Sequence, residues 1–163
     1  MAKISHRYVM SGLLEGWDWF DNGLQNVLRA NGYPTLNKSQ SMMILYISAG
    51  VQRPIDIARK MRLSRQAIRH IAHQLVELGL IESMDDERDK RSRRLQFTER
   101  SGEIRHFAER VIFELEEALR GRIGAKNLSE LKRILQLDWG PTISEAEAIA
   151  GKEPVPAKSL AGR

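Results

Sequence analysis

The sequence predicts a mainly α-helical fold that contains one two-stranded β hairpin. Apolar residues recur every three or four positions over most of the chain up to residue 137, which is the spacing of amphipathic helices. Between residues 80 and 98 the pattern changes to two short segments on either side of a charged run, which is typical of strands joined by a turn. Glycine, asparagine and proline stand between the periodic segments, where helices begin and end.

The first predicted helix runs from residue 5 to about residue 30. Asn31 and Gly32 close it, and Pro34 marks the turn that follows. Its apolar stripe comprises Leu13, Trp17, Phe20, Leu24 and Val27.

Two short helices come next. Asn37 with Gln40 three residues later has the spacing of a capping box, which opens an apolar helix through residues 42–47. Pro54 suits the first position of the following helix. The inward face of that helix is predicted to comprise Ile55, Ala58 and Met61.

A third short helix is predicted at residues 65–78, with Ser64 as its cap and Gly79 as the left-handed residue that ends it. At about 100° per residue, one face of this helix collects apolar side chains and the opposite face collects polar ones. The apolar face comprises Ile68, Ile71, Leu75 and Leu78, and the polar face comprises Gln66, Arg69, His70, His73 and Glu77.

The remaining segments are a hairpin, two helices and a tail. Strands are predicted at residues 80–84 and 93–98, and a long helix after residue 98 fades near residues 121–124. Asn127 with Glu130 predicts a second capping box, which opens a final helix. Its apolar residues are Leu128, Leu131, Ile134, Leu135 and Leu137.

Composition limits the classes of function. The chain of 163 residues has no cysteine, which excludes disulfides, thiolate nucleophiles and cysteine-based zinc sites. Its longest apolar runs fall far short of the roughly 20 residues that a membrane-spanning helix needs, and its N-terminus lacks the apolar segment of a signal peptide. We therefore expect a cytoplasmic protein without a membrane partner.

The placement of charge is more informative than the net charge of +5. Residues 57–76 contain five basic side chains and no acid, and residues 88–94 contain five basic side chains and one aspartate. A helix-turn-helix that exposes arginine and glutamine, followed by a basic hairpin, suits double-stranded DNA: both side chains can bond base edges in the major groove. Helix N-termini can bind phosphates, and Ser39, Gln40 and Ser64 lie at such termini.

Two stretches resemble the multiple-antibiotic-resistance regulator (MarR) family. They are LSRQAIRHIAHQLVELGLIE at residues 63–82 and DERDKRSRRLQFTERSG at residues 86–102. The wing signature of that family, Asp-x-Arg-x-x-Arg/Lys, matches Asp86, Arg88 and Arg91. The resemblance covers roughly residues 5–138 in the order of the elements.

The resemblance implies a mainly α winged helix-turn-helix with a two-stranded β wing and N- and C-terminal dimerisation helices. It implies base reading by Arg65, Gln66, Arg69 and His70, to which the shared helical face adds His73. The wing would comprise Asp86, which braces it, with Arg88, Lys90, Arg91 and Arg93. The dimer interface would comprise Leu13, Trp17, Phe20, Leu24, Leu131, Ile134, Leu135 and Leu137.

Four parts of the chain are expected on this basis. Residues 1–34 form the N-terminal dimerisation helix, and residues 35–98 form the winged helix-turn-helix DNA-binding region. Residues 99–139 form the C-terminal dimerisation helices, and residues 140–163 form a weakly structured tail.

Other interpretations of the same residues stay open. Asp85, Asp86, Glu87 and Asp89 can bind a divalent metal, but the interleaved cations make a solvated turn the simpler account. His70, His73 and Glu77 share a face that can hold zinc, which contact with DNA explains equally well. Trp17, Trp19 and Phe20 line either a ligand pocket or a packed interface. We expect no metal and no cofactor.

The function that these observations predict is a homodimeric, sequence-specific DNA-binding regulator with an inverted-repeat operator. The resemblance further implies a repressor that a small aromatic or anionic effector releases. The alternative is a dimeric winged-helix module that binds protein without specific DNA binding. An enzyme is not expected, because no nucleophile pairs with a base in a plausible cleft.

Overall fold

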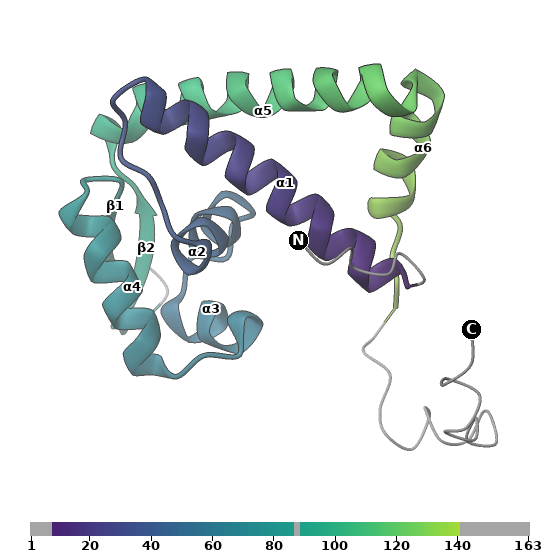
Figure 1. Ribbon diagram of the computed structural model, residues 1–163. Coiled ribbons are helices and arrows are strands. Elements are labelled where there is room, and N and C mark those ends of the chain that lie inside the picture. The colour runs from purple at the N-terminus through teal and green to yellow at the C-terminus, as the bar shows by residue number, and fades with distance from the viewer. Residues whose placement is uncertain (1–7, 87–88, 141–163) are drawn as a thin grey trace, which may run out of the picture. The chain divides into compact units, whose positions relative to one another are not determined.

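The computed structural model describes residues 8–86 and 89–140, and it leaves the side chains of residues 89–91 undescribed. The described chain falls into two compact units, which join between Arg122 and Ile123. The elements in chain order are α1 (Val9–Ala30), α2 (Lys38–Ser48), α3 (Pro54–Met61), α4 (Arg65–Glu77), β1 (Ile81–Asp86), β2 (Asp89–Phe97), a 3₁₀ turn η1 (Glu99–Ser101), α5 (Gly102–Ile123) and α6 (Ala125–Leu135). Figure 1 shows these elements, and the mainly α fold with a two-stranded wing is confirmed.

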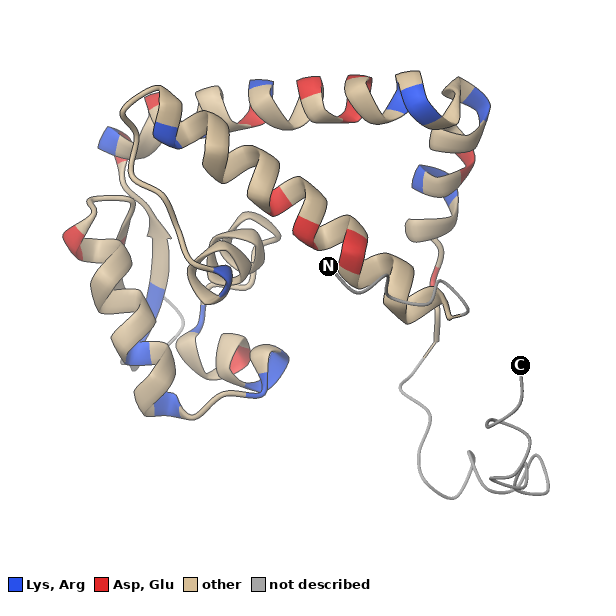
Figure 2. Ribbon diagram, viewed as in Figure 1, with Lys and Arg blue, Asp and Glu red and all other residues tan. Residues whose placement is uncertain are grey.

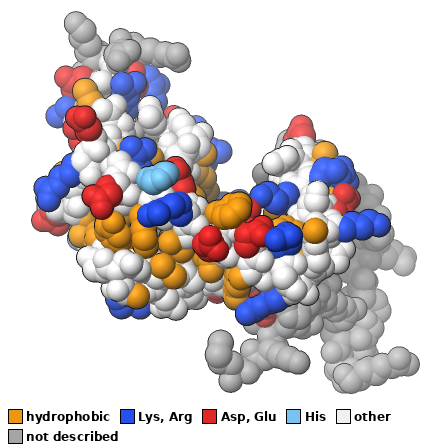
Figure 3. All heavy atoms as spheres, turned by 90° about the horizontal axis from the view of Figure 1, so that it is seen from above, with side chains coloured by type: hydrophobic (Ala, Val, Ile, Leu, Met, Phe, Trp, Pro, Cys, Tyr) orange, Lys and Arg blue, Asp and Glu red, His pale blue; other side chains and the backbone are white. Residues whose placement is uncertain are grey.

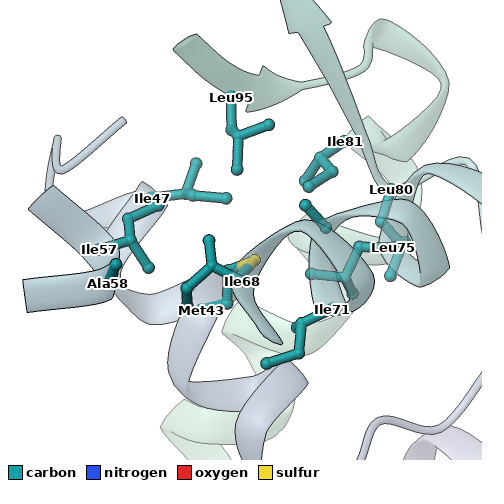
Figure 4. Packing of buried hydrophobic residues seen from close by; sticks show 11 residues of the cluster. Met43, Ile47, Ile57, Ala58, Ile68, Ile71, Leu75, Leu80, Ile81 and Leu95 are labelled. Carbon is teal, nitrogen blue, oxygen red and sulfur yellow. The ribbon is translucent and has the colours of Figure 1, made fainter. Parts of the chain in front are cut away.

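The core of the first unit lies where α2, α3 and α4 meet the hairpin. Met43, Ile57, Ile68 and Leu75 are fully buried there, and Leu95 of β2 closes the cluster. Figure 4 shows these side chains pointing toward one another from all the contributing elements. Burial of such side chains supplies most of the stability of a small helical domain.

The inward face of α3 differs from the prediction. Ile57 and Ala58 are buried, whereas Ile55 is 45% exposed. Ile57 and Met61 lie one turn apart on the same face, and Ile55 lies about 200° around the helix from Ile57, so it points away from the core. Leu78 was also wrongly assigned to the core: it follows the end of α4 and is 41% exposed.

The predicted helix ends are confirmed at α2, α3 and α4. Asn37 Oδ1 accepts a hydrogen bond from the backbone N–H of Gln40 at 3.1 Å, and Gln40 Oε1 accepts one from the N–H of Asn37 at 2.9 Å. Pro54 occupies the first turn of α3. Ser64 Oγ caps α4 through the N–H of Ala67, and Gly79 follows α4 with a φ of 71°.

The second capping box was predicted wrongly. Helix α6 begins at Ala125 after Gly124, whose φ is 85°, so Asn127 lies inside the helix and its amide donates to the carbonyl of Ile123. Glu130 pairs with Arg133 at 2.7 Å, and this hydrogen bond lowers the pKa of Glu130. Leu137 lies beyond the end of α6.

The ends of three further elements also differ from the prediction. Helix α1 begins at Val9, and residues 5–7 of the predicted helix lie outside the described residues. The strands pair antiparallel from Ile81 with Phe97 to Asp86 with Asp89, so each is longer than predicted. Charged side chains whose pattern indicated a turn therefore belong to the strands.

Helix α1 is joined to α2 and α5 by contacts that the sequence did not reveal. The buried Gln25 accepts a hydrogen bond from the N–H of Leu36 at 2.7 Å and donates one to Ser41 Oγ at 3.3 Å. Gly23 permits close packing, because a Cβ there would lie 2.8 Å from Leu115 of α5. Among the described residues, no helix is both long and apolar enough to cross a membrane.

The turn between α3 and α4 contains the one described non-glycine residue with a positive φ, Arg62 at φ 53°. Arg62→Gly should raise the free energy of unfolding by about 0.5–1 kcal/mol, because glycine has no Cβ to resist the left-handed conformation. Urea denaturation measures the change. Arg62→Ala keeps the Cβ and is the control; equal stabilisation by alanine would assign the effect to charge instead of backbone.

Candidate nucleic-acid interface and ligand pocket

The helix-turn-helix comprises α3, the turn at residues 62–64 and α4. The left-handed Arg62 ends α3, and Ser64 caps α4 directly afterwards, so the two helices are separated by a tight turn. Because the inner face of α4 is buried in the core, its opposite face is turned outward.

The outward face of α4 brings together all five predicted base-reading residues. They are exposed, and they are Arg65, Gln66, Arg69, His70 and His73. Two of them have neighbours on the helix: His70 Nε2 lies 3.0 Å from Gln74 Nε2, and His73 Nδ1 lies 3.4 Å from the carboxylate of Glu77. This face therefore presents arginine, amide and imidazole groups to the solvent.

Basic side chains continue from α4 onto α3. Figure 2 shows Lys and Arg at the end of α3 and on α4, and it shows Asp and Glu along α1. Arg59, Lys60 and Arg62 are exposed, and Arg59 pairs with Asp56 at 3.1 Å. The acid-free segment of residues 57–76 thus contributes one basic surface.

The three predicted phosphate-binding positions differ in exposure. Ser64 is exposed and Ser39 is half-buried, but Gln40 is only 8% exposed. The amide of Gln40 also donates to Gln74 Oε1 of α4 at 3.1 Å. Gln40 therefore caps α2 and ties it to α4, and its side chain is not part of the outer surface.

The wing is held near its tip by an ion pair. Asp86 is 6% exposed, and its carboxylate accepts a hydrogen bond from Arg53 Nε at 2.6 Å. On the same hairpin, Arg93 pairs with Asp85 at 2.9 Å across the strands. Arg88 lies outside the described residues, and Lys90 and Arg91 lie on β2 with side chains that are not described.

The sequence pattern did not point to Arg53. It stands 33 residues before Asp86, so no local spacing links the two. One signal could have found it, because an acid fixed at the start of the wing signature implies a cationic partner elsewhere.

A second site lies among α1, α2, α5 and the end of β2. It is a pocket of about 680 Å³, and its apolar walls include Trp17 and Phe20, two residues that were candidates for such a site. The other apolar residues that line it include Leu24, Ile44, Phe97, Ile104 and Ile112. Trp19 does not line the pocket but packs edge-on against Phe20, with 4.9 Å between the ring centroids.

The indole N–H of Trp17 is buried and has no hydrogen-bond acceptor among the described residues. Such a donor is usually satisfied in a native protein, because leaving it unpaired costs about 1–3 kcal/mol. The side chain of Trp17 lines the pocket, whereas this nitrogen itself is not accessible to solvent.

Large apolar side chains remain exposed on both units. In the first unit, Val9 and Met10 of α1 are 75% and 79% exposed, and Phe113 of α5 is 60% exposed. In the second unit, the exposed apolar residues are Leu131, Ile134, Leu135, Leu137 and Trp139. Figure 3 shows hydrophobic side chains gathered on one face of the molecule, with acidic and basic side chains beside them. Contiguous apolar surface of this kind usually marks an interface.

Solved structures share this fold. The chain is similar to the reduced form of MarR from E. coli, with 16% identity and a TM-score of 0.62 over 82% of this chain and 97% of that one. It is similar to a MarR-family transcriptional regulator from Rhodococcus sp. RHA1, with 15% identity and a TM-score of 0.60 over 83% and 94% of the two chains. It is also similar to NadR in complex with 4-hydroxyphenylacetate, with 17% identity and a TM-score of 0.61 over 83% and 94%.

No curated protein matches the chain by sequence. The model of the MarR family matches residues 38–92, which run from α2 into β2 and include the whole helix-turn-helix. This match and the shared winged-helix architecture agree: residues 38–92 are similar to the MarR family, and the described chain has the fold of solved MarR-family structures.

Proposed function

We propose that the protein binds double-stranded DNA sequence-specifically as a homodimer and represses transcription until a small molecule enters the pocket. The observation that carries the proposal is the outward face of α4, which is exposed, free of acids through residue 76 and rich in groups that bond base edges. Arginine pairs with guanine through two hydrogen bonds, and glutamine pairs with adenine in the same way.

The rival function is a winged-helix module that binds protein through the same face. A protein partner would have to bury several arginines, which are costly to desolvate unless they are paired. Phosphates supply such pairing along the whole basic surface, and this favours DNA. The enzyme interpretation has no support among the similar solved structures, which include a transcriptional regulator of the MarR family.

Selection of binding sites from random duplex DNA tests the proposal directly. An inverted-repeat consensus is expected, because two recognition helices related by a two-fold axis lie about 34–36 Å apart, one turn of DNA. Affinity for the selected site should fall linearly with log salt, with a slope of about −0.9 per phosphate contacted. Absence of any enriched sequence, with protein partners bound instead, would favour the rival.

The pocket supports the effector part of the proposal. It is lined by α1 and α5, which carry exposed apolar surface suited to a dimer interface, and by α2, which packs in the core behind α4. A ligand in the pocket contacts α1 and α5 as well as α2. It can shift the position of α2 relative to α1 and α5 if it binds one arrangement of these helices more tightly than another. The related NadR was solved in complex with 4-hydroxyphenylacetate, and we propose an aromatic effector here by analogy.

Arg69→Ala should lower affinity mainly for the selected site and reduce the discrimination between specific and random DNA by about 1–3 kcal/mol. The reason is that Arg69 lies in the middle of the exposed face of α4. Fluorescence anisotropy with both duplexes measures the difference. Arg29→Ala, on an exposed position of α1, is the control of equal charge. Equal weakening on both duplexes would restrict Arg69 to phosphate contact.

Asp86→Asn should weaken binding to all duplexes and flatten the salt dependence by about one unit for each phosphate that the wing no longer reaches, because Arg53 no longer holds the wing by a charged pair. The same flattening is expected for Arg88→Ala and Arg91→Ala. Asp18→Asn is the control, since that carboxylate is exposed on α1 and pairs with Lys38 instead of a wing residue. If Asp86→Asn keeps the wild-type affinity and slope, the wing does not contact the backbone.

The double variant Leu131→Glu and Ile134→Glu should be a monomer that binds the operator far more weakly than the wild-type dimer. These side chains are 40% and 43% exposed, so the change disrupts an interface rather than the core. Light scattering should report about twice 18.6 kDa for the wild type and about half of that for the variant. The control is the double variant Lys126→Glu and Ser129→Glu, because both positions are exposed and polar on α6. A wild-type monomer that binds a palindrome tightly contradicts the proposal.

A further inference from the structure

The charge of the pocket differs from what an anionic effector needs. Among the described residues that line it, three carry carboxylates and one carries a guanidinium, and neither lysine nor histidine is present. The acids are Asp21, Glu109 and Glu116, and the base is Arg105. The pocket therefore has an excess of negative formal charge.

Asp21 is held in place by a buried network. Its carboxylate accepts a hydrogen bond from Gln25 Nε2 at 3.3 Å, and Gln25 is only 7% exposed. Gln25 is itself fixed by the backbone N–H of Leu36 and by Ser41, both of which belong to the segment that leads into and forms α2. Asp21 lines the pocket, and this hydrogen bond favours one orientation of its carboxylate.

The single base has another partner. The guanidinium of Arg105 lies over the ring of Phe97, with 4.7 Å from Cζ to the ring centroid, and Arg105 is exposed at the rim. Phe97 also lines the pocket. Arg105 is thus engaged with the aromatic wall of the pocket.

The remaining walls suit a cation. Aromatic rings attract cationic groups through their negative faces, and Trp17, Phe20 and Phe97 all line the pocket. An anion placed among these rings would lose its hydration and meet like charge, which disfavours its binding. A cation would lose hydration as well, but it would gain the attraction of the carboxylates and the rings.

We infer that the pocket selects an aromatic organic cation, the opposite charge to the anionic phenolic effector that the family resemblance implies. The inference rests on the proposed function of the pocket as an effector site. The aromatic ring of the ligand lies among the apolar walls, and its cationic group lies at Asp21.

Three probes that share a phenol ring and a two-carbon side chain, and whose terminal groups differ in charge, test the inference. 4-Hydroxyphenylacetate is an anion, 4-hydroxyphenylacetamide is neutral, and tyramine carries the same phenol ring with a cationic ammonium group. Calorimetry with the full-length protein in the absence of DNA should show tyramine binding at least about tenfold more tightly than the anion, with the amide between them. Tighter binding of the anion, or no binding of any probe, overturns the inference.

Two matched substitutions locate the selectivity. Asp21→Asn keeps the size of the side chain and removes its charge, so the preference for tyramine should shrink severalfold while the affinity for the amide changes little. Asp18→Asn is the control, because Asp18 lies on the same helix, pairs with Lys38 and does not line the pocket. An unchanged preference in Asp21→Asn also overturns the inference.

Anisotropy with the selected duplex separates this inference from the proposed function. If the protein binds its operator and 4-hydroxyphenylacetate releases it, the effector function holds and the charge assignment fails. If tyramine binds but leaves operator affinity unchanged, the charge assignment holds and the effector function fails.

Discussion

The packing of Ile68 and Leu75 into the cluster formed by α2, α3 and the hairpin fixes the rotation of α4 about its own axis. Both side chains are fully buried, so turning the helix would expose apolar surface and leave cavities that cost several kcal/mol, about 2–5 for each large side chain withdrawn from the core. Everything on the opposite face follows from this constraint. Arg65, Arg69 and His73 lie outward because the core holds the other side.

Two polar contacts extend that constraint beyond the core. Gln40 links the start of α2 to Gln74 of α4, and Arg53 links the loop before α3 to Asp86 near the tip of the wing. Each joins a residue on the helix-turn-helix or the wing to a distant segment, so helix and wing keep a common orientation. If the surface matches two features of DNA at once, as proposed, it depends on such rigidity.

Most of the fold was predictable because it depends on local signals. The capping box at Asn37, Pro54 at the start of α3 and Gly79 after α4 act within one helical turn, and the sequence displays them directly. The wrong prediction at Asn127 shows where such signals fail. Gly124 has a positive φ and directly precedes the start of α6, so Asn127 already lies inside the helix and cannot open it. The prediction for Ile55 was wrong for a different reason. The apolar residues of a short helix can be placed toward the core by more than one rotation of the helix about its axis.

The parts of the site that could not be predicted depend on contacts between distant segments. Asp86 with Arg53 and Gln25 with Leu36 come together only in the folded chain. The pocket is an extreme case, because its walls come from α1, α2, β2 and α5. In the sequence, the acids of α1 belong to one polar face of an amphipathic helix, and only packing against α2 and α5 turns Asp21 toward a cavity.

The distribution of charge over the first unit has a physical consequence for the two sites. Basic residues occupy α3 and α4, and acidic residues line the pocket beside α1 (Figure 2). A DNA duplex at α4 and an anion in the pocket would both require positive potential, and of these two proposed sites the described residues give an excess of cations to α4 and of acids to the pocket. With this distribution the two proposed ligands would not compete for the same charge. If the proposed effector acts on α4, the coupling would travel through packing, by way of α2, which contributes both to the pocket and to the core behind α4.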